Sequence, residues 1–144
     1  MYRLDMKTFA VIDTNVLVSA LLRWDSVPGA VVEEAINGNL VPILHEKIIS
    51  EYDEVLHRKK FPFSEEDIQI LLRGLKESGV FWVPALIEEE LPDKKDVVFY
   101  AVTMEARKEE DAYLVTGNIR HFPVRPYVVT PREMLSILQR KQHE

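Results

Sequence analysis

The chain has no cysteine among its 144 residues. Disulfide bonds and thiolate metal ligands are therefore excluded, and a bound metal would need oxygen ligands or the four histidines. Apolar runs are short as well, because none reaches the roughly 18 residues of a membrane span. The first ten residues, MYRLDMKTFA, lack the apolar stretch of a signal peptide. We therefore expect a protein of the cytoplasm that does not insert into a membrane.

The chain lacks two features that are common in phosphate-binding proteins: an excess of basic residues and a glycine-rich loop after the first strand. The 18 basic residues are outnumbered by 24 acidic ones, which gives a net charge of −6. Surfaces that bind nucleic acid are usually basic, so the total charge does not predict one. No glycine-rich phosphate loop follows the first predicted strand, which argues against a nucleotide-binding or receiver-like domain. Basic residues still cluster at 57–60 (HRKK) and at Arg120, His121 and Arg125, either to contact a nucleic-acid backbone or as solvated loop charges.

What the chain does contain is typical of a soluble globular domain, with 47% apolar and 29% charged residues. Apolar runs predict strands at 9–12, 41–45, 80–84, 112–117 and 127–130. Helical spacing predicts helices at 14–22, 27–37, 46–59, between Ser64 and Gly79, at 93–108 and from Pro131 onward. This alternation predicts an α/β fold with three layers, α/β/α, and a mostly parallel sheet. Without repeats or a linker, the chain is expected to form one domain over residues 1–144.

Helix boundaries are marked by three local signals. Asn37 and Gly38 form a C-terminal cap, because glycine accepts the left-handed backbone conformation. Ser64 is placed to cap the N-terminus of the helix that follows it. Residues 130–133, with the sequence TPRE, form a capping box with proline at the first helical position. These signals agree with the periodicity.

Polar residues follow two of the predicted strands directly. Asp13 follows the first strand, and Asn118 comes after VTG at the end of the fourth. In parallel sheets the functional crevice lies beyond the carboxyl ends of the strands, so the two side chains could meet there. An unpaired buried carboxylate costs several kcal/mol, so Asp13 should be paired, hydrogen-bonded or metal-bound.

Two further acidic positions are candidates for the same crevice. Asp96 lies at a predicted helix start, where the helix dipole favours an anion. On helix 46–59 the apolar stripe centres near Tyr52, and Glu51 and Asp53 flank its two edges, so the helical wheel does not choose between them.

Each of these residues also has a purely structural explanation. Asp13 could cap the next helix, and Asp93 and Asp96 have the spacing of a cap and its partner. Asn118 could be a turn residue, and Glu51 could be a solvated helix charge. An isolated cap explains one acid, whereas several acids and an amide near one crevice suggest a hard-cation site, which suits Mg²⁺.

Four segments carry a resemblance to a known family. They are VIDTNVLVSALL with Asp13 and Asn15, ISEYDEVLHRKKF with Glu51, DKKDVVFYAV with Asp93 and Asp96, and AYLVTGNIRHFP with Asn118. With these segments the sequence resembles the PIN-domain nucleases, and more narrowly the branch of toxin components of toxin–antitoxin pairs. The resemblance runs from about Phe9 to Leu138, the expected core of the domain. The first and last segments are fairly specific, and the middle two would be weak alone.

The resemblance implies a Mg²⁺- or Mn²⁺-dependent endoribonuclease that hydrolyses RNA phosphodiesters. The implied catalytic and metal-binding residues are Asp13, Glu51, Asp96 and Asn118. We expect Asp13 and Asp96 to bind metal directly, and Glu51 to act through water or to orient the nucleophile. Asn15, Thr116 and Asp93 are expected to hold these acids in place. Arg120, His121 and Lys59 are expected to contact the RNA backbone. The resemblance also implies a small antitoxin partner and a homodimer.

The sequence departs from the family at two places, and alternatives stay open. Asn118 stands where many relatives carry Asp, which should lower metal affinity, and His45 stands where a serine often begins the second-acid helix. One alternative is a non-catalytic PIN-like module that binds nucleic acid or protein through a degraded metal site. Another is a phosphotransfer enzyme of the haloacid-dehalogenase type, but that family needs an Asp at Asn15 and a downstream Lys that we do not find.

Overall fold

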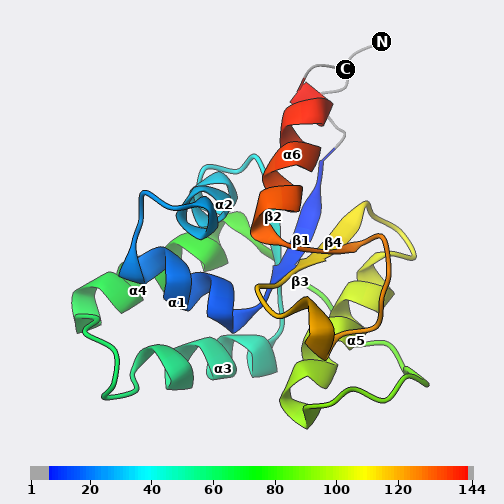
Figure 1. Ribbon diagram of the computed structural model, residues 1–144, viewed down its shortest axis with the longest axis horizontal. Helices are drawn as coiled ribbons and strands as arrows, with labels where there is room; N and C mark the ends of the chain where they lie inside the picture. The colour runs from blue at the N-terminus through cyan, green and yellow to red at the C-terminus, as the bar shows by residue number, and fades with distance from the viewer. Residues whose placement is uncertain (1–6, 143–144) are drawn as a thin grey trace.

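The computed structural model describes residues 7–142 of the chain, and the remainder of the predicted 1–144 domain lies outside the described residues. Five strands form one sheet (Figure 1): β1 (Phe9–Ile12), β2 (Val41–Leu44), β3 (Val80–Phe81), β4 (Ala112–Val115) and β5 (Val128–Val129). Their order is β3-β2-β1-β4-β5, and every pair is parallel. The α/β fold with a parallel sheet is thus confirmed.

The strand order places a topological switch at the centre of the sheet. From β1 the chain moves through β2 to β3 on one side, and β4 and β5 then add on the other side of β1. β1 and β4 pair along their full length, from Phe9 opposite Ala112 to Ile12 opposite Val115. Ligands of open parallel sheets bind beyond the carboxyl ends of the strands at such a switch. The residues that follow Ile12 and Val115 therefore occupy the position where a site is expected.

Helices cover both faces of the sheet. The helical segments are α1 (Thr14–Leu22), α2 (Val27–Ile36), α3 (Glu46–Leu56), α4 (Glu65–Ser78), the short 3-10 helix η1 (Lys94–Asp96), α5 (Val97–Ala106), the 3-10 helix η2 (Ile119–His121) and α6 (Pro131–Gln142). α1, α2, α4 and α6 pack together on one side, and α5 packs against β1 and β4 on the other (Figure 1). This arrangement is expected for a parallel sheet with right-handed crossovers, because the strand order changes direction across the sheet after β3.

The core lies between these layers. All four residues of β1 and all four of β2 are buried, as expected for strands covered on both faces. Tyr52 of α3 is also buried, and its hydroxyl donates a hydrogen bond to the carbonyl of Ile12. This bond ties α3 to the carboxyl end of β1. Within residues 7–142 no helix is long and apolar enough to cross a membrane.

The predicted caps are confirmed. Ser64 accepts a hydrogen bond from the backbone N–H of Asp67 at 3.1 Å. The capping box is complete, since Glu133 accepts from the N–H of Thr130 at 2.9 Å and Thr130 accepts from the N–H of Glu133 at 3.2 Å. Gly38 has a φ of 87°, the left-handed conformation that ends α2. Although it is not a serine, His45 caps α3, and its Nδ1 accepts from the N–H of Lys47 at 3.1 Å.

Several predicted elements were too long. The predicted strand 80–84 ends at Phe81 because the chain leaves the sheet there, and the N–H of Ala85 bonds to the carbonyl of Ala101 of α5. The predicted helix 46–59 ends at Leu56, where the N–H of Arg58 bonds only three residues back, to Val55.

Five other predicted elements are also shorter in the structure. The predicted helix 93–108 begins as a 3-10 turn at 94–96 and is α-helical only from 97 to 106. The strands predicted at 41–45, 112–117 and 127–130 lose their polar or terminal residues, and the helix predicted at 27–37 ends at Ile36. These differences reflect hydrogen bonds that apolar patterning does not report.

Candidate active site

A cavity of about 400 Å³ opens at the carboxyl ends of the central strands. Six of the predicted site residues line it: Asp13, Glu51, Asp93, Asp96, Asn118 and His121. Asn15, which was expected to support the acids, lines it as well. These residues come from the ends of β1 and β4, from α3, and from η1 and η2. The sequence therefore identified side chains that the fold brings together from four separate segments.

Asp13 is the most buried acid of the cavity, with 6% of its surface exposed. It occupies the N-cap position of α1 but makes no capping hydrogen bond with its side chain, so capping does not explain it. Instead, Oδ2 accepts hydrogen bonds from the hydroxyl of Thr116 at 2.7 Å and from Nδ2 of Asn15 at 3.3 Å. Burial raises the pKa of Asp13 to about 6, and the nearby charges of Asp96 and Glu51 also raise it, whereas the Thr116 hydrogen bond opposes the rise.

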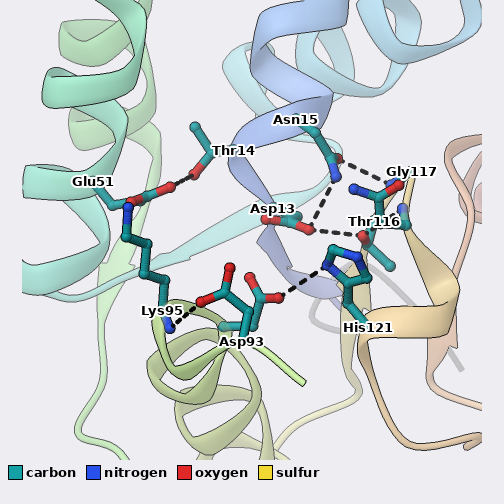
Figure 2. Close-up of polar contacts among 11 residues, drawn as sticks. Asp13, Thr14, Asn15, Glu51, Asp93, Lys95, Thr116, Gly117 and His121 are labelled. Carbon is teal, nitrogen blue, oxygen red and sulfur yellow. Dashed lines mark hydrogen bonds and ion pairs between the residues drawn. The ribbon is translucent and has the colours of Figure 1, made fainter. Parts of the chain in front are cut away.

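A network of side-chain bonds joins the end of β1 to the end of β4 (Figure 2). Oδ1 of Asn15 accepts from the N–H of Gly117 at 3.0 Å, while its Nδ2 donates to Asp13. Thr116, which is fully buried, accepts from the N–H of Asn118 at 2.9 Å and donates to Asp13. Asn15 and Thr116 therefore hold the Asp13 carboxylate in place.

Glu51, rather than Asp53, is the acid of α3 that faces the cavity. Glu51 is half-buried, and its Oε2 accepts a hydrogen bond from the hydroxyl of Thr14 at 3.1 Å (Figure 2). Asp53 is exposed and lies 3.4 Å from the ring of His57 on the surface. The helical wheel could not choose between Glu51 and Asp53, because the contact that distinguishes them is made with Thr14, which lies 37 residues away in sequence.

Asp96 and its neighbours form the opposite wall of the cavity. The Asp96 side chain is 14% exposed, and its Oδ2 lies 3.3 Å from Nδ1 of His121. Burial raises the pKa of Asp96, the charge of Asp93 raises it further, and the nearby His121 opposes the rise. Asp93 is exposed and caps η1, accepting from the N–H of Lys95 at 3.0 Å. The structural explanation of Asp93 as a cap is therefore correct, although Asp93 also lines the cavity.

The donor set of this cavity fits a hard divalent cation, although it is not a closed cage. Among residues 7–142, no three acidic or histidine side chains converge closely enough to hold a metal ion in a ready-made site. Each carboxylate instead has a local partner: Thr116 for Asp13, Thr14 for Glu51 and His121 for Asp96. Mg²⁺ keeps several waters and is commonly bound by one or two carboxylates, so an open set of acids suits it.

The predicted RNA contacts are only partly located at the cavity. His121 lines it, whereas Arg120 and Lys59 do not. Three other basic residues line it: Arg58 and Lys60, which belong to the HRKK cluster that the sequence analysis named, and Lys95, which it did not name. The HRKK cluster gave a signal for the first two, but spacing alone did not show which of its members turns inward.

One family comparison matches this chain. The model of the PIN domain matches residues 10–120, which is most of the chain. The match includes Asp13, Glu51, Asp96 and Asn118 and ends one residue before His121. A search of curated proteins found no matching relative. The chain therefore belongs to the PIN domain family, whose members are typically nucleases that use divalent metal ions.

Proposed function

We propose that this protein is a divalent-metal-dependent endoribonuclease that hydrolyses RNA phosphodiesters with Mg²⁺ or Mn²⁺. The observation that carries the proposal is Asp13, a buried carboxylate without a capping role that faces a cavity lined by three further acids. Clustered acids of this kind are costly unless a cation binds between them. A nuclease needs such a cation, because its substrate is itself an anion that the acids alone would repel.

The residues around Asp13 have distinct roles in this proposal. A bound divalent ion would neutralise the phosphate and lower the pKa of a water molecule. Asp13 and Asp96 would bind the ion, and the hydrogen bonds from Thr116 and Asn15 would fix the Asp13 carboxylate for that purpose. Glu51 has one oxygen bonded to Thr14, which leaves Oε1 to bind a water of the ion or the attacking water.

Asn118 would complete the metal site as a neutral ligand. Its side chain lines the cavity, and its backbone N–H is fixed to Thr116 at 2.9 Å. An amide oxygen can bind Mg²⁺ but adds no charge, so the affinity should depend more on the substrate phosphate. Arg58, Lys60 and His121 would hold the RNA backbone at the rim, with Arg120 and Lys59 as more distant contacts.

The biological role that we propose is the toxin component of a toxin–antitoxin pair in the cytoplasm, where RNA is available. The four acids of the cavity support this role, because a small antitoxin could block them with a basic segment. We also propose a homodimer, supported by exposed apolar side chains beside the edge strand β3, at Phe81, Val83 and Leu86.

A second candidate is a non-catalytic PIN domain that binds nucleic acid or protein. Two observations favour it: Asn118 stands where an acid is common in the family, and no three acids converge among the described residues. This candidate requires no metal-dependent cleavage, and it predicts that Asp13→Ala is tolerated.

The experiment that separates the two candidates is cleavage of a mixed-sequence single-stranded RNA by the purified protein. The reaction is run with Mg²⁺, with Mn²⁺ and with EDTA, beside the Asp13→Asn variant. We expect cleavage that requires metal and disappears in the variant. Equal activity of variant and parent would reveal a contaminating nuclease, and the absence of cleavage by folded protein would favour the non-catalytic module.

A further inference from the structure

A second cavity adjoins the candidate active site. It has a volume of about 490 Å³, and Glu51 and Lys95 line both cavities. Figure 2 shows the Lys95 side chain extending from η1 toward Glu51, so these two residues form the border between the cavities. Beyond this border the wall changes in character. It carries the further lysines Lys47 of α3 and Lys94 of η1, which do not line the active site. We call this second hollow the lysine cavity.

The lysines of this cavity make no close ion pair in the described part of the chain, and the wall that they share contains one carboxylate, that of Glu51. None of Lys47, Lys94 and Lys95 lies within an ion pair there, although the protein has a net charge of −6. Other cationic residues of the chain, such as Arg58 and Lys108, are paired with carboxylates on their own helices or beside them. The three lysines outnumber the single carboxylate of this wall, Glu51, so the remaining positive charge favours an anion from outside the chain.

The floor of the lysine cavity is apolar. It is formed by Pro84, Ala85, Val97, Val98 and Ala101. A ligand that fits this cavity therefore combines negative charge with a flat or compact apolar part. A nucleotide has this composition, with a phosphate for the lysines and a sugar and base for the floor.

We propose that the lysine cavity binds the nucleotide of a single-stranded RNA that lies next to the scissile phosphate. This inference rests on the proposed function. Its geometric basis is continuity, because a polymer held in the acidic cavity passes Glu51 and Lys95 directly into the second hollow. An acidic peptide would satisfy the lysines as well, but RNA also offers a second phosphate to the divalent ion proposed for the adjoining acidic cavity, so a single RNA strand fits both cavities. Lysine contacts to phosphate give affinity without sequence information.

The first test measures RNA binding by a variant that leaves the active-site cavity intact. Lys47→Gln and Lys94→Gln are combined, because both residues line the lysine cavity alone. The matched control combines Lys7→Gln and Lys76→Gln, two exposed positions outside both cavities. Binding of a labelled 12-nucleotide RNA is followed by fluorescence anisotropy over a series of salt concentrations.

We expect the first variant to raise Kd by about tenfold and to lower the slope of log Kd against log salt by about 0.7 for each phosphate released. The control should change neither by more than about twofold. Equal affinity and equal slope in variant and control would overturn the inference. Binding of labelled hexaglutamate, a model acidic peptide, is measured for the same proteins. If the first variant loses hexaglutamate binding while its RNA binding is unchanged, the inference is overturned and the cavity is assigned to an acidic peptide.

The second test identifies the phosphate itself. One neutral methylphosphonate is moved along the RNA, and kcat/KM is measured for parent and lysine variant at each position. At one position beside the cleavage site, we expect the methylphosphonate to lower kcat/KM of the parent. The same substitution should not lower kcat/KM of the variant further, because the lysines that would contact this phosphate are already removed. Additive losses at every position would contradict the inference. If the parent cleaves RNA and the variant matches it, only this inference fails. If the parent does not cleave at all, the proposed function fails as well.

Discussion

The two walls of the active-site cavity are built in different ways. The strand wall, at the ends of β1 and β4, consists of Asp13, Asn15 and residues 116–118. It is linked by four side-chain hydrogen bonds of 2.7 to 3.3 Å, two of which cross between the ends of the two strands. The helix wall consists of residues 93–96 and His121. It has one cross-segment contact, of 3.3 Å between Asp96 and His121.

This difference indicates that the two walls have different roles in the site. A buried charge must be held rigidly, since its hydrogen bonds compensate for the lost water, and the strand wall provides this for Asp13. The helix wall is more exposed and has fewer bonds, so it can adjust to a cation and to a substrate of variable shape. We therefore expect changes in the strand wall to have larger effects than changes in the helix wall.

The largest expected effect is the loss of the acid on the strand wall. Asp13→Asn should lower kcat/KM for RNA cleavage by more than about 100-fold. Mutation of a residue that only hydrogen-bonds to a metal ligand already lowers activity by about 10- to 100-fold. Asp96→Asn is the matched change on the helix wall, and we expect it to cost less. Single-turnover cleavage rates at saturating Mg²⁺ measure both. A larger loss for Asp96→Asn would reverse the proposed order of the two walls.

The next largest effect should come from the partner that holds Asp13. Thr116→Val removes the hydroxyl that donates at 2.7 Å while it preserves the shape of the side chain. We expect a loss of activity of about 10- to 100-fold and weaker Mg²⁺ binding. Thr116→Ser keeps the hydroxyl and should retain most of the activity. Equal loss in both variants would point to packing rather than to the hydrogen bond.

The stability of the metal-free protein should depend on the ionisation of Asp13. Its pKa is about 6 in the folded protein against 3.8 ordinarily, so the folded state binds the proton more tightly than the unfolded state. The folded protein therefore loses stability as the pH rises from about 4 to 6, and the full penalty remains above that range. At pH 7 without metal, Asp13→Asn should raise the free energy of unfolding by about 1 to 2 kcal/mol.

Chemical denaturation at pH 7 and pH 4.5 checks this prediction. The stabilising effect of Asp13→Asn should be smaller at pH 4.5, where Asp13 of the parent is largely protonated. Mg²⁺ should stabilise the parent and have little effect on the variant, because ligand binding to the folded state adds stability. A variant that is less stable than the parent at pH 7 would contradict the assigned cause of the shift.

The smallest effect is expected for a change that strengthens the strand wall. Asn118→Asp adds a carboxylate at an exposed position of the cavity, which should tighten Mg²⁺ binding by up to about tenfold through added charge. Isothermal titration calorimetry measures the affinity directly. Asn118→Ala serves as the control and should weaken binding slightly. If Asn118→Asp leaves the affinity unchanged, this side chain does not contribute to the metal site.

The sequence predicted the strand wall better than the helix wall. Asp13 and Asn118 each follow a buried strand, and strand ends of a parallel sheet meet at one edge, so local patterns were enough to bring them together. The α/β fold followed from the same alternation of strands and helices. Asp96 was a candidate from its place at a helix start, and the family resemblance then chose Glu51 over Asp53.

The residues that the sequence missed depend on contacts between distant segments. Thr14 bonds to Glu51 across 37 residues, and no periodicity reports such a pair. Lys95 lines two cavities, and it lies in the segment between β3 and α5, where the apolar pattern predicted a strand that runs on past Phe81.

The most direct test of the account is a crystal structure of the protein soaked with Mn²⁺, with anomalous scattering recorded to locate the metal. The account predicts an anomalous peak in the cavity of about 400 Å³, bound by Asp13 at the end of β1, and no such peak in Asp13→Asn crystals. A peak elsewhere, or an empty cavity in protein that cleaves RNA under the same conditions, would contradict it.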